Sequence, residues 1–198
     1  PSVNFHLWEP CNFRCKFCFA AFQDVKKSIL PKGHLLREQA IQVVKMLAEN
    51  GFEKITFAGG EPTLCPWIND LIALAKDCGM TTNLVTNGWM LLKKPELLKS
   101  LSLNLKWLTV SIDSLIPEAN ISSGRALGGK QAILRAEYIQ LIDQARELGV
   151  RIKVNTVVHQ LNRKEPLWEF VAEVKPERWK IFQVLPVDGQ NDLHFGDY

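Results

Sequence analysis

The chain has 198 residues, of which 46% are hydrophobic and 23% charged. This composition supports one packed core and excludes a disordered or fibrous protein. The net charge of +3 is too small for a nucleic-acid coat, and the apolar stretches are interrupted well before the roughly 20 residues that a membrane-spanning helix needs. We therefore expect a soluble, cytoplasmic protein that binds neither nucleic acid nor membrane, and we expect it to be a monomer.

Short β-rich runs alternate with amphipathic helical stretches along the whole chain. Apolar residues recur at helical spacing in 36–47, 68–75 and 134–148, and a glycine follows each stretch as in a helix C-cap. Residues 95–103 are a weaker helical candidate, whereas the Gly and Ser content of 115–129 favours a long loop. Strands are predicted at residues 3–8, 54–58, 82–86, 108–112, 151–158 and 178–185. This alternation predicts an α/β fold in which a parallel sheet curls into a partial (β/α)6 barrel.

Three of the five cysteines, Cys11, Cys15 and Cys18, follow the first predicted strand in a C-x3-C-x2-C pattern. A loop of this spacing can wrap one cubane, and three thiolates on a four-iron cluster leave one iron open to another ligand. A structural zinc site is the alternative, but such a site normally closes with a fourth ligand. Cys65 and Cys78 are distant in the sequence, and Cys78 falls within a predicted amphipathic helix, where a thiol acts as a small hydrophobe. The pattern therefore favours a [4Fe-4S] cluster in a reducing compartment.

Glycines and polar residues gather where the predicted strands end. The strand-end candidates are Gly59, Gly60, Glu61 and Pro62 after the second strand, Thr86 and Asn87 at the third, and Ser111 and Asp113 at the fourth. The paired glycines let the backbone approach a ligand closely, although the same four residues could form only a tight turn. Because the carboxyl ends of parallel strands share one mouth of a barrel, we expect these groups, and Phe17 beside the last cysteine, to lie near the cysteine loop.

Basic residues occupy the last two predicted strands. Lys153 and Asn155 share one face of the fifth strand, and Arg178 and Lys180 share one face of the sixth. Any one of them could be a solvated surface charge, but both faces of a parallel sheet are normally buried. Arg suits bidentate phosphate recognition and Lys acts as a compact charge, so the group favours a polyanionic substrate, with Arg125 as a fifth candidate.

The cysteine pattern together with Gly-Gly-Glu-Pro resembles the radical S-adenosylmethionine (SAM) superfamily. Further blocks, spread over nearly the whole chain, resemble its viperin family. These blocks are residues 2–6, the spacing from Cys18 to Leu30 and Pro31, residues 53–62, Asp113 with Ser114, Asn120 with Gly124 and Arg125, residues 153–155, and residues 178–183. The resemblance implies a partial barrel of the radical SAM type, a [4Fe-4S] cluster on Cys11, Cys15 and Cys18, and SAM as cosubstrate.

The resemblance also implies an activity, which is conversion of a ribonucleoside triphosphate to its 3′-deoxy-3′,4′-didehydro analogue, an antiviral chain terminator. Electrons would come from a donor such as flavodoxin or ferredoxin. The implied SAM-binding residues are Phe17, Gly59, Gly60, Glu61, Pro62, Thr86, Asn87, Ser111 and Asp113. The implied nucleotide-binding residues are Arg125, Lys153, Asn155, Arg178 and Lys180, and no catalytic side chain is assigned.

Two alternatives stay open at the level of the sequence. One is a different radical SAM reaction, such as deazapurine ring contraction or glycyl-radical activation. The other is a catalytically dead, metal-stabilised interaction module. Viperins continue beyond the point that corresponds to Tyr198 with a segment that helps close the substrate site, so we expect residues 1–198 to be a single radical SAM core domain without that C-terminal extension.

Overall fold

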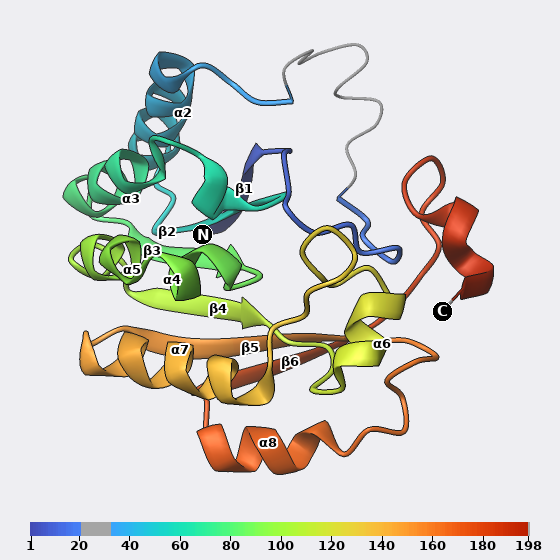
Figure 1. The fold of residues 1–198 in the computed structure, drawn as a ribbon. Coiled ribbons are helices and arrows are strands. Elements are labelled where there is room, and N and C mark those ends of the chain that lie inside the picture. The colour runs from blue at the N-terminus through green and yellow to red at the C-terminus, as the bar shows by residue number, and fades with distance from the viewer. Residues whose placement is uncertain (21–32, 198) are drawn as a thin grey trace.

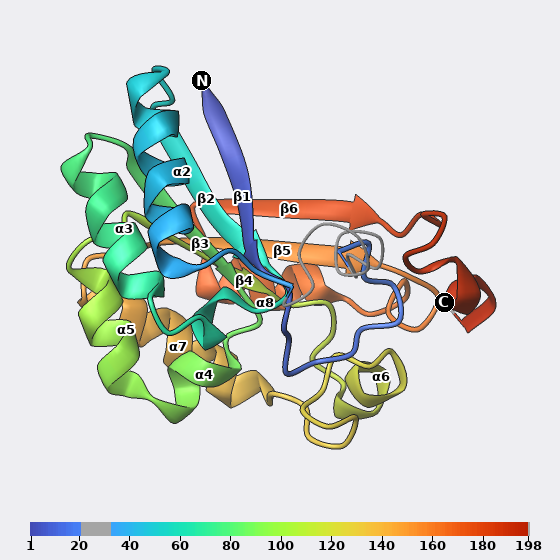
Figure 2. The ribbon, with the colours of Figure 1, turned by 90° about the horizontal axis from the view of Figure 1, so that it is seen from above.

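Six parallel strands form one continuous sheet in the computed structural model, which describes residues 1–20 and 33–197 (Figure 1). The strands are β1 (Ser2–Trp8), β2 (Lys54–Gly59), β3 (Thr81–Thr86), β4 (Trp107–Ser111), β5 (Arg151–Val158) and β6 (Arg178–Gln183). They pair in chain order, so β1 and β6 are the two edge strands. Viewed from above, β1 runs steeply across the direction of β6, which shows the strong twist of the sheet (Figure 2). The predicted α/β partial barrel is confirmed.

Helices connect successive strands, and most of them cover the outer face of the sheet. They are α2 (Arg37–Glu49), α3 (Ile68–Asp77), α4 (Trp89–Lys93), α5 (Pro95–Ser102), α6 (Pro117–Ser122), α7 (Arg135–Glu147) and α8 (Leu167–Val174), with 3-10 turns η1 (Pro62–Leu64) and η2 (Asp192–Asp197). The predicted C-cap glycines Gly51, Gly79 and Gly149 follow α2, α3 and α7 and have φ of 77°, 82° and 78°. No helix in the described part of the chain is both long and apolar enough to cross a membrane.

The structure corrects three details of the sequence analysis. The expected loop over 115–129 contains α6, which begins with Pro117 at its first helical position. Helix α8 was not predicted, because its apolar residues extend over only eight positions. Cys78 is exposed at the end of α3, while Cys65 is the buried thiol. Leu30 and Pro31, which belong to the family resemblance, lie outside the described residues.

The two faces of the sheet differ in chemistry. Side chains on the outer face, such as Phe57, Leu84 and Leu108, are fully buried under the helices and form the core. The opposite face, which we call the inner face, is polar. At its centre the Asn83 side-chain amide donates to Thr56 (3.2 Å) and accepts from the Thr109 hydroxyl (2.9 Å). An apolar outer face therefore stabilises a barrel whose inner face is free to bind polar groups.

Candidate functional site

The loop that follows β1 contains the three cysteines and rests on the carboxyl end of β2. Gly60 N–H donates to Trp8 O at 2.6 Å, and Glu61 N–H donates to Pro10 O at 2.9 Å. A Cβ atom on Gly60 would lie 1.9 Å from Glu9 O, so no larger residue fits. The close approach that these glycines permit is thus to the backbone of the cysteine loop itself.

The other side of the cysteine loop is held by the end of α6. Arg14 N–H donates to Gly124 O at 3.1 Å, and Lys16 N–H donates to Ser123 O at 2.9 Å. A Cβ atom on Gly124, which has φ of 80°, would lie 2.0 Å from Arg14 O. Residues that are distant in the sequence therefore fix the loop from both sides by backbone hydrogen bonds.

The thiols of Cys11, Cys15 and Cys18 are free of disulfides and interact electrostatically with one another. Burial raises the pKa of Cys11 to about 11 and that of Cys15 to about 12, and it also raises the pKa of Cys18. The guanidinium of Arg125 opposes this effect at all three thiols. Within residues 1–20 and 33–197, no three His, Cys, Asp or Glu side chains are arranged to hold a single metal ion.

The carboxylate of Glu61 is fully buried and accepts four hydrogen bonds from the chain. Its donors are the Thr63 N–H (3.0 Å) and hydroxyl (2.5 Å), the Thr86 hydroxyl (2.7 Å) and the Asn87 N–H (2.8 Å). Burial raises the pKa of Glu61, and the donated hydrogen bonds oppose that rise. Glu61 therefore joins the turn after β2 to the end of β3.

The end of β3 also reaches the cysteine loop. The side-chain amide of Asn87 donates to the side-chain oxygen of Asn12 at 2.8 Å, next to Cys11. The amide nitrogen of Asn12 is buried and has no hydrogen-bond partner among the residues that the structure describes. Pro62 is buried in the first position of η1, and Ser111 is half-buried at the end of β4. The structure thus brings the predicted strand-end residues to the same end of the barrel as the cysteines.

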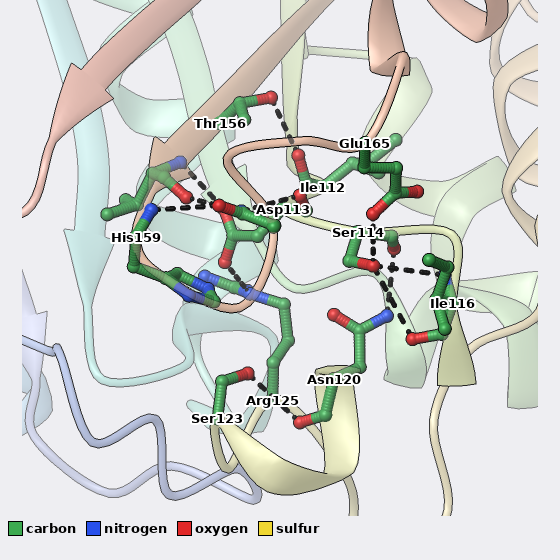
Figure 3. Close-up of polar contacts among 12 residues, drawn as sticks. Ile112, Asp113, Ser114, Ile116, Asn120, Ser123, Arg125, Thr156, His159 and Glu165 are labelled. Carbon is green, nitrogen blue, oxygen red and sulfur yellow. Dashed lines mark hydrogen bonds and ion pairs between the residues drawn. The ribbon is translucent and has the colours of Figure 1, made fainter. Parts of the chain in front are cut away.

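A buried ion pair lies beside this loop (Figure 3). The guanidinium of Arg125 pairs with one carboxylate oxygen of Asp113, while the other oxygen accepts the N–H of Val157 at 2.8 Å. The guanidinium carbon also lies 5.4 Å from the centre of the Phe17 ring, and the same ring stacks on His159. The sequence analysis grouped Arg125 with the phosphate-binding candidates. In the structure its partners, Asp113 and Phe17, lie in and beside the cysteine loop.

The remaining basic candidates face one another across β5 and β6. The register pairs Lys153 with Arg178 and Asn155 with Lys180 on the inner face. Lys153 is 5% exposed, and its ammonium lies 4.2 Å from the centre of the Trp107 ring. The side-chain oxygen of Asn155 is buried and has no hydrogen-bond partner within the described part of the chain.

Lys54, the first residue of β2, joins these cations and was missed from the sequence. Burial and then the neighbouring charges of Lys54, Arg178 and Lys180 lower the pKa of Lys153 to about 8. Among the described residues, none of these four cations forms an ion pair with a carboxylate. We call Lys54, Lys153, Arg178 and Lys180 the inner cations. Because side chains alternate between the two faces of a strand, the position of Lys54 in the predicted second strand could have identified it.

Comparison with known proteins agrees with this geometry. Residues 8–174 match the model of the Radical SAM superfamily. An S-adenosylmethionine-dependent nucleotide dehydratase of Flammeovirga pacifica is 58% identical over 97% of this chain and 65% of that protein. A protein of the same description from Lacinutrix mariniflava is 55% identical over 97% of this chain and 40% of that protein. The chain thus spans less than two thirds of the length of these two relatives.

A solved structure shows the same fold at lower identity. Streptococcus suis SuiB bound to S-adenosylmethionine matches 96% of this chain and 42% of its own, with a TM-score of 0.71 and 20% identity. From the family match over most of its length, together with its sequence relatives, the chain belongs to the radical SAM superfamily, in the viperin-like group of nucleotide dehydratases.

Proposed function

We propose that the protein is a radical SAM nucleotide dehydratase that converts a ribonucleoside triphosphate to its 3′-deoxy-3′,4′-didehydro analogue. The observation that supports this most directly is the set of inner cations. Four cations without a carboxylate partner face the interior of a barrel whose carboxyl end carries three free thiols. Lys153 is buried, Lys54 is half-buried, and Arg178 and Lys180 are exposed on the edge strand β6. Four like charges held close together around a buried ammonium are costly unless an opposite charge binds, and a triphosphate supplies that charge.

The cysteine loop fits a [4Fe-4S] cluster. Its three thiols are near one another, a buried guanidinium favours their thiolate forms, and backbone hydrogen bonds fix the loop on both sides. Cys11, Cys15 and Cys18 would hold the cluster and leave one iron for SAM. When bound and reduced, the cluster supplies the electron that cleaves SAM to methionine and a 5′-deoxyadenosyl radical.

We propose that SAM binds along the strand ends, against Phe17, Gly59, Gly60, Glu61, Pro62, Thr86, Asn87, Ser111 and Asp113. The carboxylates of Glu61 and Asp113 already accept hydrogen bonds from the chain, so their task is to hold neighbouring backbone groups in place. The half-buried Ser111 and the backbone at Gly59 are polar groups that these hydrogen bonds leave available to the ligand. Arg125 acts on this cosubstrate side of the site.

The nucleotide would lie deeper in the barrel. Lys153, Arg178, Lys180 and Lys54 bind its phosphates, and the unpartnered oxygen of Asn155 accepts a hydrogen bond from a hydroxyl or amino group of the nucleotide. Such an arrangement positions the ribose between the phosphates and the cosubstrate, and positioning of this kind supplies much of the rate. The chain's own contribution is to orient the sugar and exclude competing hydrogen donors.

The remaining features of the proposal follow from the family. We propose that residues 1–198 act as one radical SAM core, as a monomer in the cytoplasm, with flavodoxin or ferredoxin as electron donor and without nucleic acid or membrane as partner. An antiviral role follows from the chain-terminating product.

The test is turnover by anaerobically reconstituted protein. The protein is incubated with SAM, dithionite and each of the four ribonucleoside triphosphates, and 5′-deoxyadenosine and nucleotide products are followed by mass spectrometry. We expect at least one triphosphate to lose the mass of one water and to stimulate 5′-deoxyadenosine formation. Formation of 5′-deoxyadenosine that no nucleotide alters would refute the dehydratase assignment.

A further inference from the structure

His159 follows β5 directly, and its imidazole is buried beside the cysteine loop. The side chain is 4% exposed and stacks on Phe17, with ring centres 5.0 Å apart and planes inclined by 26°. Its Nε2 atom is buried and has no hydrogen-bond partner among the described residues. Buried polar atoms in folded proteins are nearly always hydrogen-bonded, so this atom requires an explanation.

The hydrogen bonding of the ring defines which nitrogen carries the proton. The N–H of Leu161 donates to Nδ1 at 3.3 Å, so Nδ1 presents its lone pair. Burial lowers the pKa of His159 and keeps the ring neutral. A neutral imidazole with an accepting Nδ1 has its proton on Nε2. The unpartnered atom is therefore a hydrogen-bond donor.

The surroundings limit the kind of acceptor that this donor can meet. Phe17, on which the imidazole stacks, directly precedes the proposed cluster ligand Cys18 in the sequence. The charged groups that act on His159 are Asp113 and Arg125, which pair with each other (Figure 3). With that carboxylate already paired and a guanidinium nearby, the imidazole stays neutral, and a neutral acceptor is enough to satisfy its Nε2–H.

We propose that His159 is a SAM-binding residue whose Nε2–H donates to a ring nitrogen of the adenine. This inference rests on the proposed function, because it takes SAM as the ligand of the cysteine loop. Adenine is a neutral ring whose nitrogens are hydrogen-bond acceptors, so it supplies the partner that the orphaned donor lacks. The contact would help orient the adenosyl group without taking part in the chemistry.

His159→Phe tests the proposal because it keeps an aromatic ring beside Phe17 and removes the donor. We expect the dissociation constant for SAM, measured by calorimetry on the reconstituted protein, to rise about five- to tenfold, the range for one neutral hydrogen bond. His159→Gln, whose amide nitrogen can reach the position of Nε2, should bind SAM within about twofold of wild type. His34→Phe, at a histidine stacked on Trp8 rather than Phe17, is the matched control and should bind as wild type.

Analogues of S-adenosylhomocysteine identify the acceptor. Among the 1-deaza, 3-deaza and 7-deaza forms, we expect one to bind wild type more weakly than the parent compound while His159→Phe does not distinguish that form from the parent. Thermal denaturation without ligand should show His159→Phe to be about as stable as wild type, because the substitution removes the unpartnered donor but also the acceptor of the Leu161 N–H.

Each contrary result has a distinct meaning. Wild-type SAM affinity in His159→Phe, or equal discrimination of all analogues by both proteins, overturns the role of His159 and leaves the proposed function intact. A less stable unliganded His159→Phe with unchanged SAM affinity shows a structural role and also overturns it. If the reconstituted wild type binds no SAM, the proposed function fails, and the inference fails with it.

Discussion

Charged side chains have partners within the chain in one region of the barrel and lack them in another. At the carboxyl end, the carboxylate of Glu61 accepts four hydrogen bonds and Asp113 is paired with Arg125. On the inner face, the inner cations have no carboxylate partner among the described residues, and Lys153 is held at a lowered pKa by its burial and its neighbours. Both regions contain buried charge, which on the inner face is that of Lys153, but only the first region supplies the opposite groups from within the chain.

This difference indicates that the charges at the carboxyl end stabilise the structure, whereas those on the inner face bind a ligand. A buried charge with all of its partners fixes the segments that supply them, and removing one partner leaves the other buried and unpaired. A buried charge without partners costs folding free energy until a ligand of opposite sign binds. Substitutions at the carboxyl end should therefore alter assembly and stability, whereas substitutions of the inner cations should weaken nucleotide binding and leave cluster assembly and SAM binding unchanged.

The largest effect is expected at the cysteine loop. Cys15→Ala should abolish cluster assembly and SAM cleavage, because two protein thiolates do not hold a four-iron cluster with one distinct iron. Iron and sulfide content and the absorbance near 400 nm of the reconstituted protein measure this loss. Cys78→Ala, at an exposed cysteine outside the loop, is the control and should assemble normally. Substantial 5′-deoxyadenosine formation by Cys15→Ala would contradict the assignment.

A large loss of stability is expected at Glu61. Glu61→Ala removes the common acceptor of four donors that β3 and η1 supply, so we expect the free energy of unfolding to fall by about 3 to 5 kcal/mol. Urea denaturation of the protein without ligands measures the loss. Glu49→Ala, at an exposed position on α2, should change it by less than about 0.5 kcal/mol. Equal stability of the two variants would show that the carboxylate is not needed to join these segments.

A moderate effect, confined to the ligand, is expected on the inner face. Arg178→Ala or Lys180→Ala should weaken nucleoside triphosphate binding about tenfold or more, because each charge-assisted contact contributes roughly 1.5 to 3 kcal/mol. Cluster content and SAM affinity should stay at wild-type values, as measured by absorbance and calorimetry. Lys45→Ala, at an exposed lysine on α2, is the matched control. A comparable loss in the control would indicate a general charge effect and remove the distinction between the regions.

The smallest effect concerns pH. The pKa of Lys153, lowered from 10.5 to about 8, means that the folded chain binds this proton more weakly than the unfolded chain, so stability without nucleotide should rise between about pH 8 and 10.5. A bound polyanion favours the charged amine. Nucleotide affinity should therefore be full below pH 8 and fall by up to about tenfold at pH 9.

The control for this prediction is Lys153→Met, which should bind nucleotide more weakly at every pH but lose the decline above pH 8. Calorimetric titrations between pH 7.5 and 9 compare the two proteins. A decline of the same size in Lys153→Met would assign the titration to another group and remove Lys153 from the account.

The sequence predicted the fold well because each strand and crossover helix has a local pattern. The six strands agree with the structure to within two residues at each end, and the glycines after α2, α3 and α7 have the expected left-handed φ. Helix α8 was missed because it has only eight residues, most of them apolar, so its sequence gives little helical periodicity.

The site was predicted less completely, because partners distant in the sequence decide what each side chain does. The alternation of side chains along each strand placed Lys153 and Arg178 on faces that could meet, and the register shows that they lie side by side. Nothing local indicated that Arg125 would pair with Asp113 or that Glu61 would take its donors from two elements. His159 has no motif around it, and only its burial against Phe17 identifies it.

The central claim is that the inner cations bind a triphosphate, and nucleotide-dependent formation of 5′-deoxyadenosine tests it most directly. Wild type, Arg178→Ala and Lys180→Ala are compared with nucleoside tri-, di- and monophosphates of the preferred base. We expect stimulation of the wild type to fall as the phosphate chain shortens, and both variants to respond weakly even to the triphosphate while still cleaving SAM slowly. If all three proteins respond alike to all three phosphate lengths, the inner cations do not bind the triphosphate, and the account is contradicted.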